Sequence, residues 1–168
     1  MNKYQELWWL QAHSDHEAFA LLRERGVAPC HLLHYLQMVA EKLGKAYLWR
    51  SGSPPPASHA GFVQFMRLMG GVRATERARI AEIFEFKRFE DFQKWIRLAL
   101  PSAYALERLA PAFAHDGPNP EYPWPRAEPV HAPATYNFEL WRDIRDSAHG
   151  RRLLRVIEIA VTRFPEYA

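Results

Sequence analysis

The sequence predicts an all-α protein, an up-and-down helical bundle, and three observations support this class. Apolar residues recur every three or four positions in several segments, which is the spacing of one helix face. No segment shows the strict apolar and polar alternation of a half-buried strand, and no internal repeat stands out. Of the 168 residues, 48% are hydrophobic and 14% are aromatic, which is enough to bury a core. We expect one domain over residues 1–168.

Two helices are expected in the first third of the chain. The first should begin at Ser14, because Ser14-Asp15-His16-Glu17 has the Ser-x-x-Glu form of a capping box, and end near Gly26. The second should carry Pro29 in its first turn and stop before the Gly- and Pro-rich segment 51–56. Its predicted buried face consists of Leu32, Leu36, Val39, Leu43 and Tyr47.

Five further helices are expected. Short ones should cover residues 62–69 and 77–84, on either side of a break at Gly70-Gly71. From Phe89 to Ala110 the helical spacing continues through Pro101, which predicts a long helix kinked near that proline. The last expected elements are a short helix capped by Asn137 and a final helix from Leu153 to Phe164, separated by Gly150.

A long ordered loop is expected before the C-terminal helices. Residues 114–136 have no helical pattern and contain six of the thirteen prolines, namely Pro118, Pro120, Pro123, Pro125, Pro129 and Pro133. The loop also carries Tyr122, Trp124 and Tyr136. These rings could pack across the bundle, or the loop could cover a ligand.

Composition limits the class of protein further. The net charge of +3 comes from 22 basic and 19 acidic residues, so a nucleic-acid partner is permitted but not required. Cys30 is the only cysteine, which excludes an internal disulfide and favours a reducing compartment; we therefore expect a cytoplasmic protein. The first ten residues lack a signal-peptide cleavage site, and no window reaches membrane length, so no membrane partner is expected.

No metal and no cofactor are expected. The pairs His13-x-x-His16 and His31-x-x-His34, the second beside Cys30, have a spacing that could place two ligands on one helix face. We expect the pairs at distant ends of two antiparallel helices, too far apart to share one ion.

A family resemblance rests on about the first third of the chain. Its residues are Trp9, then Asp15-x-Glu17-Ala18, then Ala40-Glu41-Lys42-Leu43-x-Lys45-Ala46, then Gly52 and a Pro-rich turn leading to His59. This resembles a HEPN domain. The resemblance implies a helical bundle that often forms homodimers and works with RNA or nucleotides. It also implies, in many members, a nucleotidyltransferase-type protein partner in a toxin-antitoxin or defence context. It does not imply catalysis in every member.

Many HEPN proteins carry an Arg, four to six residues and then a His, which serve metal-independent RNA cleavage. Arg142 and His149 fit this motif, with Arg108 and His115 as the runner-up. A His can move a proton near neutral pH, and an Arg fork can stabilise charge on the phosphorane. The motif discriminates poorly here, because it also occurs in segments 25–31 and 126–131.

Arginines near the start of the last helix are candidate phosphate ligands. Arg145, Arg151 and Arg152 lie close in sequence to Arg142 and Arg155. The alternative is a mixed solvated face, because acidic residues share the region: Glu139, Asp143, Asp146 and Glu158. In the second helix, Glu41 and Lys45 are expected to form an exposed pair worth a few tenths of a kcal/mol.

Three hypotheses for function follow. We favour a non-catalytic HEPN-like binding or assembly module in nucleotide or RNA biology, acting as a homodimer. The first alternative is a metal-independent endoribonuclease that uses Arg142 and His149. The second is a structural protein-protein interaction domain, favoured by the aromatic loop and the apolar excess.

Overall fold

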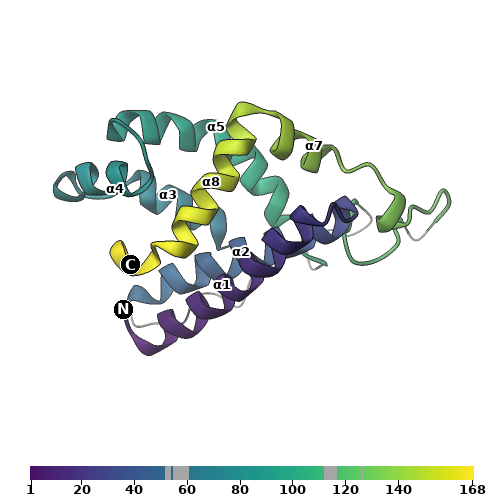
Figure 1. Cartoon of the computed structure of the whole chain (residues 1–168), viewed down its shortest axis with the longest axis horizontal. Helices are drawn as coiled ribbons and strands as arrows, with labels where there is room; N and C mark the ends of the chain where they lie inside the picture. Colours follow the sequence, from purple (N-terminus) through teal and green to yellow (C-terminus); the bar gives the residue numbers. More distant parts are fainter. Residues whose placement is uncertain (52–53, 55–60, 112–116, 126) are drawn as a thin grey trace.

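The computed structural model describes residues 1–51, 54, 61–111, 117–125 and 127–168. Seven α-helices and no strand occur in these ranges, so the predicted all-α helical bundle is confirmed (Figure 1). The helices are α1 (Lys3–Glu24), α2 (Pro29–Leu48), α3 (Phe62–Gly70), α4 (Arg77–Ile83), α5 (Phe89–Glu107), α7 (Glu139–Asp146) and α8 (Ala148–Thr162). Figure 1 shows α1 and α2 side by side as an antiparallel pair. Helix α8 contacts α1, α2, α5 and α7, so it lies at the centre of the bundle.

Helix α1 begins at Lys3, so the prediction that it starts at Ser14 was wrong. The capping box is formed instead by Asn2 and Gln5. The Asn2 side chain accepts hydrogen bonds from the backbone N–H groups of Tyr4 and Gln5 at 3.0 Å, and the Gln5 side chain accepts one from Asn2 N at 3.0 Å. The side-chain amides of Asn2 and Gln5 thus replace the hydroxyl and the carboxylate of a Ser-x-x-Glu capping box. The helix ends at Glu24, and Gly26 follows with a φ of +66°, which confirms the predicted end.

Helix α2 matches its prediction closely. Pro29 occupies the first turn, and all five residues of the predicted core face are at most 4% exposed. The helix also passes very close to the start of α3. A Cβ placed on Gly44 would lie 2.4 Å from the backbone carbon of Gly61, so only glycine allows this approach.

Helices α3, α4 and α5 lie where the sequence predicted helices, and Pro101 lies inside α5. Helix α5 ends at Glu107, before Ala110. The Glu107 carboxylate is buried, and its Oε1 accepts a hydrogen bond from the backbone N–H of Val63 at 2.8 Å. This distant side chain therefore caps the N-terminus of α3, which has no cap of its own.

The Pro-rich loop packs a cluster of its own rings. Trp124 is 5% exposed, and its ring centroid lies 4.8 Å from that of Tyr136 and 5.7 Å from that of Phe138. Tyr122, by contrast, is 58% exposed. Ring packing is thus confirmed for Trp124 and Tyr136, whereas Tyr122 faces solvent.

The C-terminal helices are divided at Ser147, so the predicted division at Gly150 was wrong. Ser147 is extended, with a ψ of 151°, and its Oγ accepts a hydrogen bond from Gly150 N at 3.0 Å, which caps α8. Gly150 lies in the first turn of α8 and packs on α7, where a Cβ would lie 2.4 Å from the Asp143 carbonyl oxygen. The predicted cap Asn137 was also wrong, since Phe138 holds the N-cap position of α7. Within the described ranges, no helix has the length and apolar character needed to cross a membrane.

Candidate functional site

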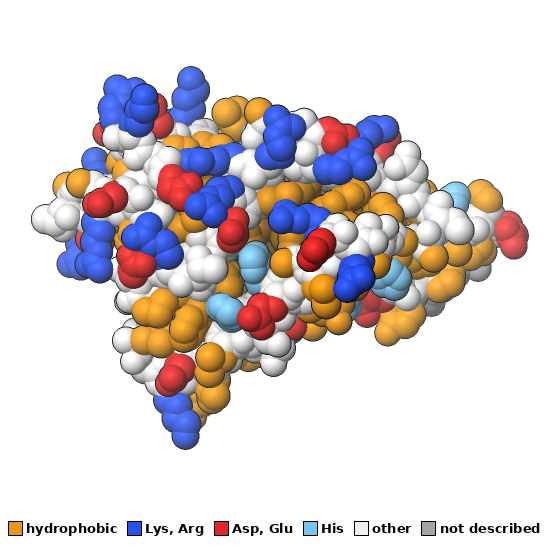
Figure 2. All heavy atoms as spheres, viewed as in Figure 1, with side chains coloured by type: hydrophobic (Ala, Val, Ile, Leu, Met, Phe, Trp, Pro, Cys, Tyr) orange, Lys and Arg blue, Asp and Glu red, His pale blue; other side chains and the backbone are white. Residues whose placement is uncertain are grey.

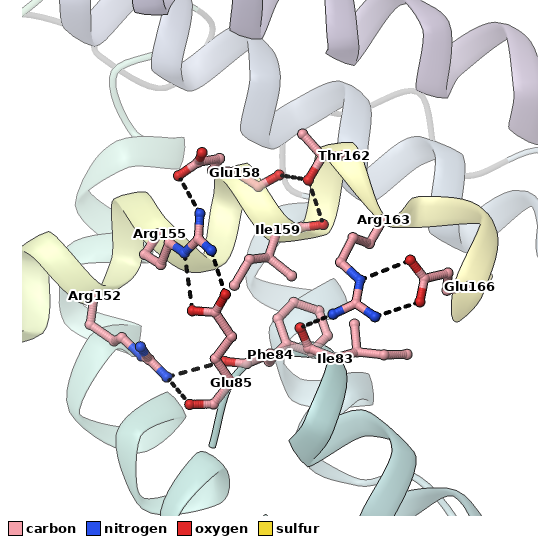
Figure 3. A network of polar contacts seen from close by, with 10 residues as sticks. All are labelled: Ile83, Phe84, Glu85, Arg152, Arg155, Glu158, Ile159, Thr162, Arg163 and Glu166. Atoms are coloured by element: carbon pink, nitrogen blue, oxygen red, sulfur yellow. Dashed lines mark hydrogen bonds and ion pairs between the residues drawn. The ribbon is translucent and has the colours of Figure 1, made fainter. Parts of the chain in front are cut away.

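Arginines of α8 cap the C-terminal end of α4 (Figure 3). Arg152 Nη2 donates to the carbonyl oxygens of Phe84 at 3.1 Å and Glu85 at 2.6 Å. Arg163, directly after α8, donates from Nη1 to the Ile83 carbonyl at 3.1 Å. Carbonyls at a helix C-terminus have no partner within the helix, so these guanidinium groups satisfy them and hold α4 on α8.

Arg155 lies beside this cap and is held by two carboxylates. Its Nε donates to Glu85 Oε2 at 3.1 Å, a second donor reaches the other Glu85 oxygen, and Nη1 lies 3.0 Å from Glu158 Oε2. These hydrogen bonds raise the pKa of Arg155 above its ordinary value, and the Arg155 contact lowers the pKa of Glu85. Glu85 itself has a φ of 61°, which is unusual for a residue other than glycine.

The two residues of the predicted catalytic pair lie on different helices. Arg142 lies on α7 and His149 on α8, on opposite sides of the break at Ser147, and both side chains are exposed. The nearest acidic partner of Arg142 is Glu139, 3.8 Å away, and no hydrogen bond or ring contact joins residues 142 and 149. Of the runner-up pair, Arg108 lines a cavity of about 310 Å³ together with Tyr136 and Phe138, whereas His115 lies outside the described residues.

Two of the predicted phosphate ligands gather around Asp146. Arg145 holds its carboxylate with two hydrogen bonds of 2.6 and 2.7 Å, and Arg151 donates to its backbone carbonyl. The pKa of Asp146 is lowered, first by the hydrogen bond from Arg145 and further by the charges of Arg142 and Arg151. This region is therefore a mixed charged face, as the second interpretation of the sequence expected.

A groove between α1 and α8 combines basic and apolar side chains. Its cavity measures about 320 Å³ and is lined by His16, Phe19, Ala20 and Arg23 from α1 and by Arg151, Leu154, Arg155 and Glu158 from α8. Histidine side chains lie near the middle of the face that Figure 2 shows, among acidic and basic groups. We call this cavity the α1–α8 groove.

Helical spacing on both sides of the groove aligns its side chains. The α1 residues and the α8 residues each follow an i, i+3 or i+4, i+7 pattern, which puts them on one face of their helix. Trp9 fixes the two helices to each other, because its Nε1 donates to the Val161 carbonyl at 2.7 Å and its ring stacks on Phe164 at 6.3 Å. Phe19 is 2% exposed and packs edge-on against Trp141. The floor of the groove is therefore supported by a ring of α7.

The groove has an excess of positive charge on its rim. The lining includes Arg23, Arg151 and Arg155 and the carboxylate of Glu158. Because Arg155 is paired with both Glu158 and Glu85, the positive charge of the rim comes from Arg23 and Arg151. The pKa of His16 is lowered, mainly by burial and also by the charges of His13 and Arg23, while Glu158 and Glu17 oppose the shift. His16 is therefore neutral at neutral pH and can donate or accept a hydrogen bond. Such a rim above an apolar floor suits an anion that has an apolar or planar part.

Sequence reasoning had named only part of this groove. His16 was considered only as half of a possible metal pair, and Arg23 was not singled out. The predicted helix from Ser14 to Gly26 already put both on one face, but nothing in the sequence shows that α8 lies beside that face. In the described residues no group of three or more His, Cys, Asp or Glu side chains could hold a metal ion.

The predicted Glu41–Lys45 pair exists but is largely buried, which corrects the expectation that it is exposed. Lys45 Nζ lies 2.6 Å from Glu41 Oε1, with the two side chains 16% and 11% exposed. Lys45 also lies 4.8 Å above the Trp8 ring. Nearby, Lys42 of α2 pairs with the buried Asp15 of α1. These contacts join α1 to α2, so the HEPN-like residues serve packing here.

The sequence matches no protein-family model, and comparisons with curated proteins and with solved structures found no match.

Proposed function

We propose that this protein is a non-catalytic binding module that holds a nucleotide, free or as part of RNA, in the α1–α8 groove. The observation that carries the proposal is the arrangement of two exposed arginines, Arg23 and Arg151, and a neutral His16 around an apolar floor. The role is the one implied by the HEPN resemblance, and the side chains of the groove support this proposal.

The chemistry of the groove suits the two halves of a nucleotide. Arg23 and Arg151 present exposed guanidinium groups, which bind phosphate oxygens through paired hydrogen bonds. Ala20 and Leu154 offer apolar surface for a base. The charge of Arg155 is offset by its pairs with Glu85 and Glu158, so Arg23 and Arg151 would supply the contacts to phosphate.

The proposal is tested by calorimetric titration with adenosine and guanosine monophosphates. We expect Arg23→Ala and Arg151→Ala each to weaken binding about tenfold, because each removes a charge-assisted hydrogen bond. Arg25→Ala is the matched control, since Arg25 is an exposed arginine of the same region that does not line the groove. Equal affinity of all four proteins, or no binding by the wild type to nucleotides or RNA, would rule out the groove as the site.

We further propose that the module acts as a homodimer, and the exposed apolar side chains of α1 support this. Tyr4, Leu7, Leu10 and Leu21 are 56%, 53%, 51% and 54% exposed. A monomer rarely leaves so many large apolar groups on one helix in water. Light scattering should give a dimer mass for the wild type and a monomer mass for the variant that combines Leu7→Glu with Leu10→Glu. A monomeric wild type at micromolar concentration would contradict the dimer alone. The resemblance also favours a nucleotidyltransferase-type partner, and the single cysteine, Cys30, favours a cytoplasmic location.

A further inference from the structure

The cavity beside Arg108 is separate from the α1–α8 groove, and the described residues that line the two are all different. We call it the loop cavity, because the Pro-rich loop forms part of it between the end of α5 and the start of α7. Its volume is about 310 Å³, and its lining includes Ala105, Arg108, Tyr136, Phe138 and Glu139. Small-molecule sites begin at about 300 Å³, so the loop cavity suits a small ligand.

Two rings in the wall of the loop cavity are nearly perpendicular to each other. The centroids of Tyr136 and Phe138 are 5.1 Å apart, and their planes make an angle of 82°. Both rings also pack on Trp124, which exchanges backbone hydrogen bonds of 3.1 and 2.6 Å with His131. The packing of the loop itself therefore holds the two rings. A flat ligand ring that stacks on one of them is perpendicular to the other, and both arrangements of aromatic rings are favourable.

Arg108 supplies the positive charge of the loop cavity. Its side chain is exposed, and within the described ranges its guanidinium makes no hydrogen bond or ion pair. The carboxylate in the lining, that of Glu139, is 81% exposed and lies 3.8 Å from Arg142, so water and this arginine offset its charge. The other described lining residues carry no charge. An anion that enters the cavity therefore finds Arg108 as its partner.

We propose that the loop cavity binds an aromatic monocarboxylate, a small planar acid with one negative charge. Arg108 holds the carboxylate, because a guanidinium can donate two parallel hydrogen bonds to its oxygens. Tyr136 and Phe138 hold the ring. A phosphate dianion fits less well, since one arginine would have to balance two charges close to the carboxylate of Glu139. This ligand goes beyond the proposed function of the α1–α8 groove. The Pro-rich loop then both packs its own rings and covers a ligand, the two roles that its sequence left open.

The test is a titration of the whole chain with phenylacetate, followed through the backbone amide signals in NMR spectra. We expect saturable binding with a Kd of about 1 mM, an ordinary value for so small a ligand. The largest shifts should belong to the amides of Tyr136, Phe138 and Glu139. Arg108→Gln should weaken binding about tenfold, because it removes the charge-assisted hydrogen bonds. Arg97→Gln is the matched control, since Arg97 is an exposed arginine of α5 that does not line the cavity.

Two analogues of phenylacetate and a second variant make the outcome specific. Phenylacetamide keeps the shape without the charge, acetate keeps the charge without the ring, and each should bind several-fold more weakly than phenylacetate. Ala105→Phe should abolish binding, because the added ring fills the cavity from α5.

The proposal is overturned if phenylacetamide or acetate binds as tightly as phenylacetate, if phenylacetate does not bind, or if Arg108→Gln and Arg97→Gln have equal effects. Should Ala105→Phe fail to fold, the comparison of the two arginine variants decides alone. Nucleotide binding in the α1–α8 groove depends on other residues, so either proposal can fail without the other.

Discussion

Glu107 shows how a single side chain can matter without any sequence signal. It is 7% exposed, and burial raises the pKa of its carboxyl, while hydrogen bonds from the backbone N–H groups of Val63 and Phe62 oppose the shift. A raised pKa means that the folded state favours the protonated form. The stabilisation is therefore complete below the ordinary pKa of 4.5 and is lost as the pH rises through the raised value.

The first prediction concerns Glu107→Gln, which resembles the protonated carboxyl at every pH. We expect its free energy of unfolding to rise relative to the wild type as the pH increases from about 4 to about 7, and then to level off. Urea unfolding at a series of pH values measures this difference, in which the other titrating groups cancel. If the free energy of unfolding of the wild type instead rises relative to that of the variant over this range, the backbone hydrogen bonds to the ionised carboxylate outweigh the cost of burying its charge.

The second prediction concerns His149. Because it is exposed and makes no contact with Arg142, we expect His149→Ala to leave the nucleotide affinity of the groove within about twofold of the wild type. We also expect neither protein to cleave RNA in the presence of EDTA. Cleavage by the wild type that the substitution abolishes would favour the endoribonuclease hypothesis over the binding module.

At the scale of the helices, α4 depends on α8 for its C-terminal end. The seven-residue α4 is too short to be stable alone, and its last carbonyls receive hydrogen bonds from Arg152 and Arg163. The sequence had indicated a charged cluster here, but its partners lie about seventy positions away and could not be assigned without the fold.

The third prediction tests this cap. Arg152→Met should lower the free energy of unfolding by about 1 to 2 kcal/mol, because it leaves the Phe84 and Glu85 carbonyls without their donor. Arg145→Met is the matched control, since Arg145 pairs with its exposed neighbour Asp146 and its loss should cost less than about 0.5 kcal/mol. Both values come from chemical denaturation. Equal losses would mean that Arg152 acts only as another surface charge.

Helices with a strong apolar stripe could be predicted from the sequence, but the residues at which they begin and end were harder to predict. The core face of α2 could be read directly because each apolar residue falls on one side of a single helix. The start of α1 was misplaced because the capping pattern of Ser14 and Glu17 occurs inside the helix, where the backbone N–H groups already have partners in the preceding turn. The division at Ser147 was missed because Gly150 was expected to interrupt the helix. Its actual role is to allow α7 and α8 to touch.

For the whole molecule, the α1–α2 pair is joined by a buried ionic contact between Asp15 and Lys42, whose side chains are 8% and 14% exposed. Gln11 adds a hydrogen bond to Asp15 at 3.1 Å. The candidate groove, built from α1 and α8, could not be predicted, because it requires knowing that the first and last helices lie together.

The fourth prediction follows from this contact. Lys42→Met should destabilise the protein by about 3 kcal/mol, because it leaves the Asp15 carboxylate buried without its partner. Adding Asp15→Leu should recover most of the loss, since two apolar side chains can replace a buried ion pair. Thermal or urea unfolding of the single and double variants provides the test. No recovery in the double variant would show that Asp15 is needed for its bond with Gln11 and not only for the charge of Lys42.

The central position of α8 has a consequence for synthesis on the ribosome. Every arginine that caps α4, and one entire wall of the α1–α8 groove, belongs to this helix or directly follows it. A nascent chain that has exposed α1 to α7 therefore has a partly open core and no complete binding surface. The binding proposed for the groove could begin only once α8 has left the exit tunnel, so it would be separated in time from translation of the protein.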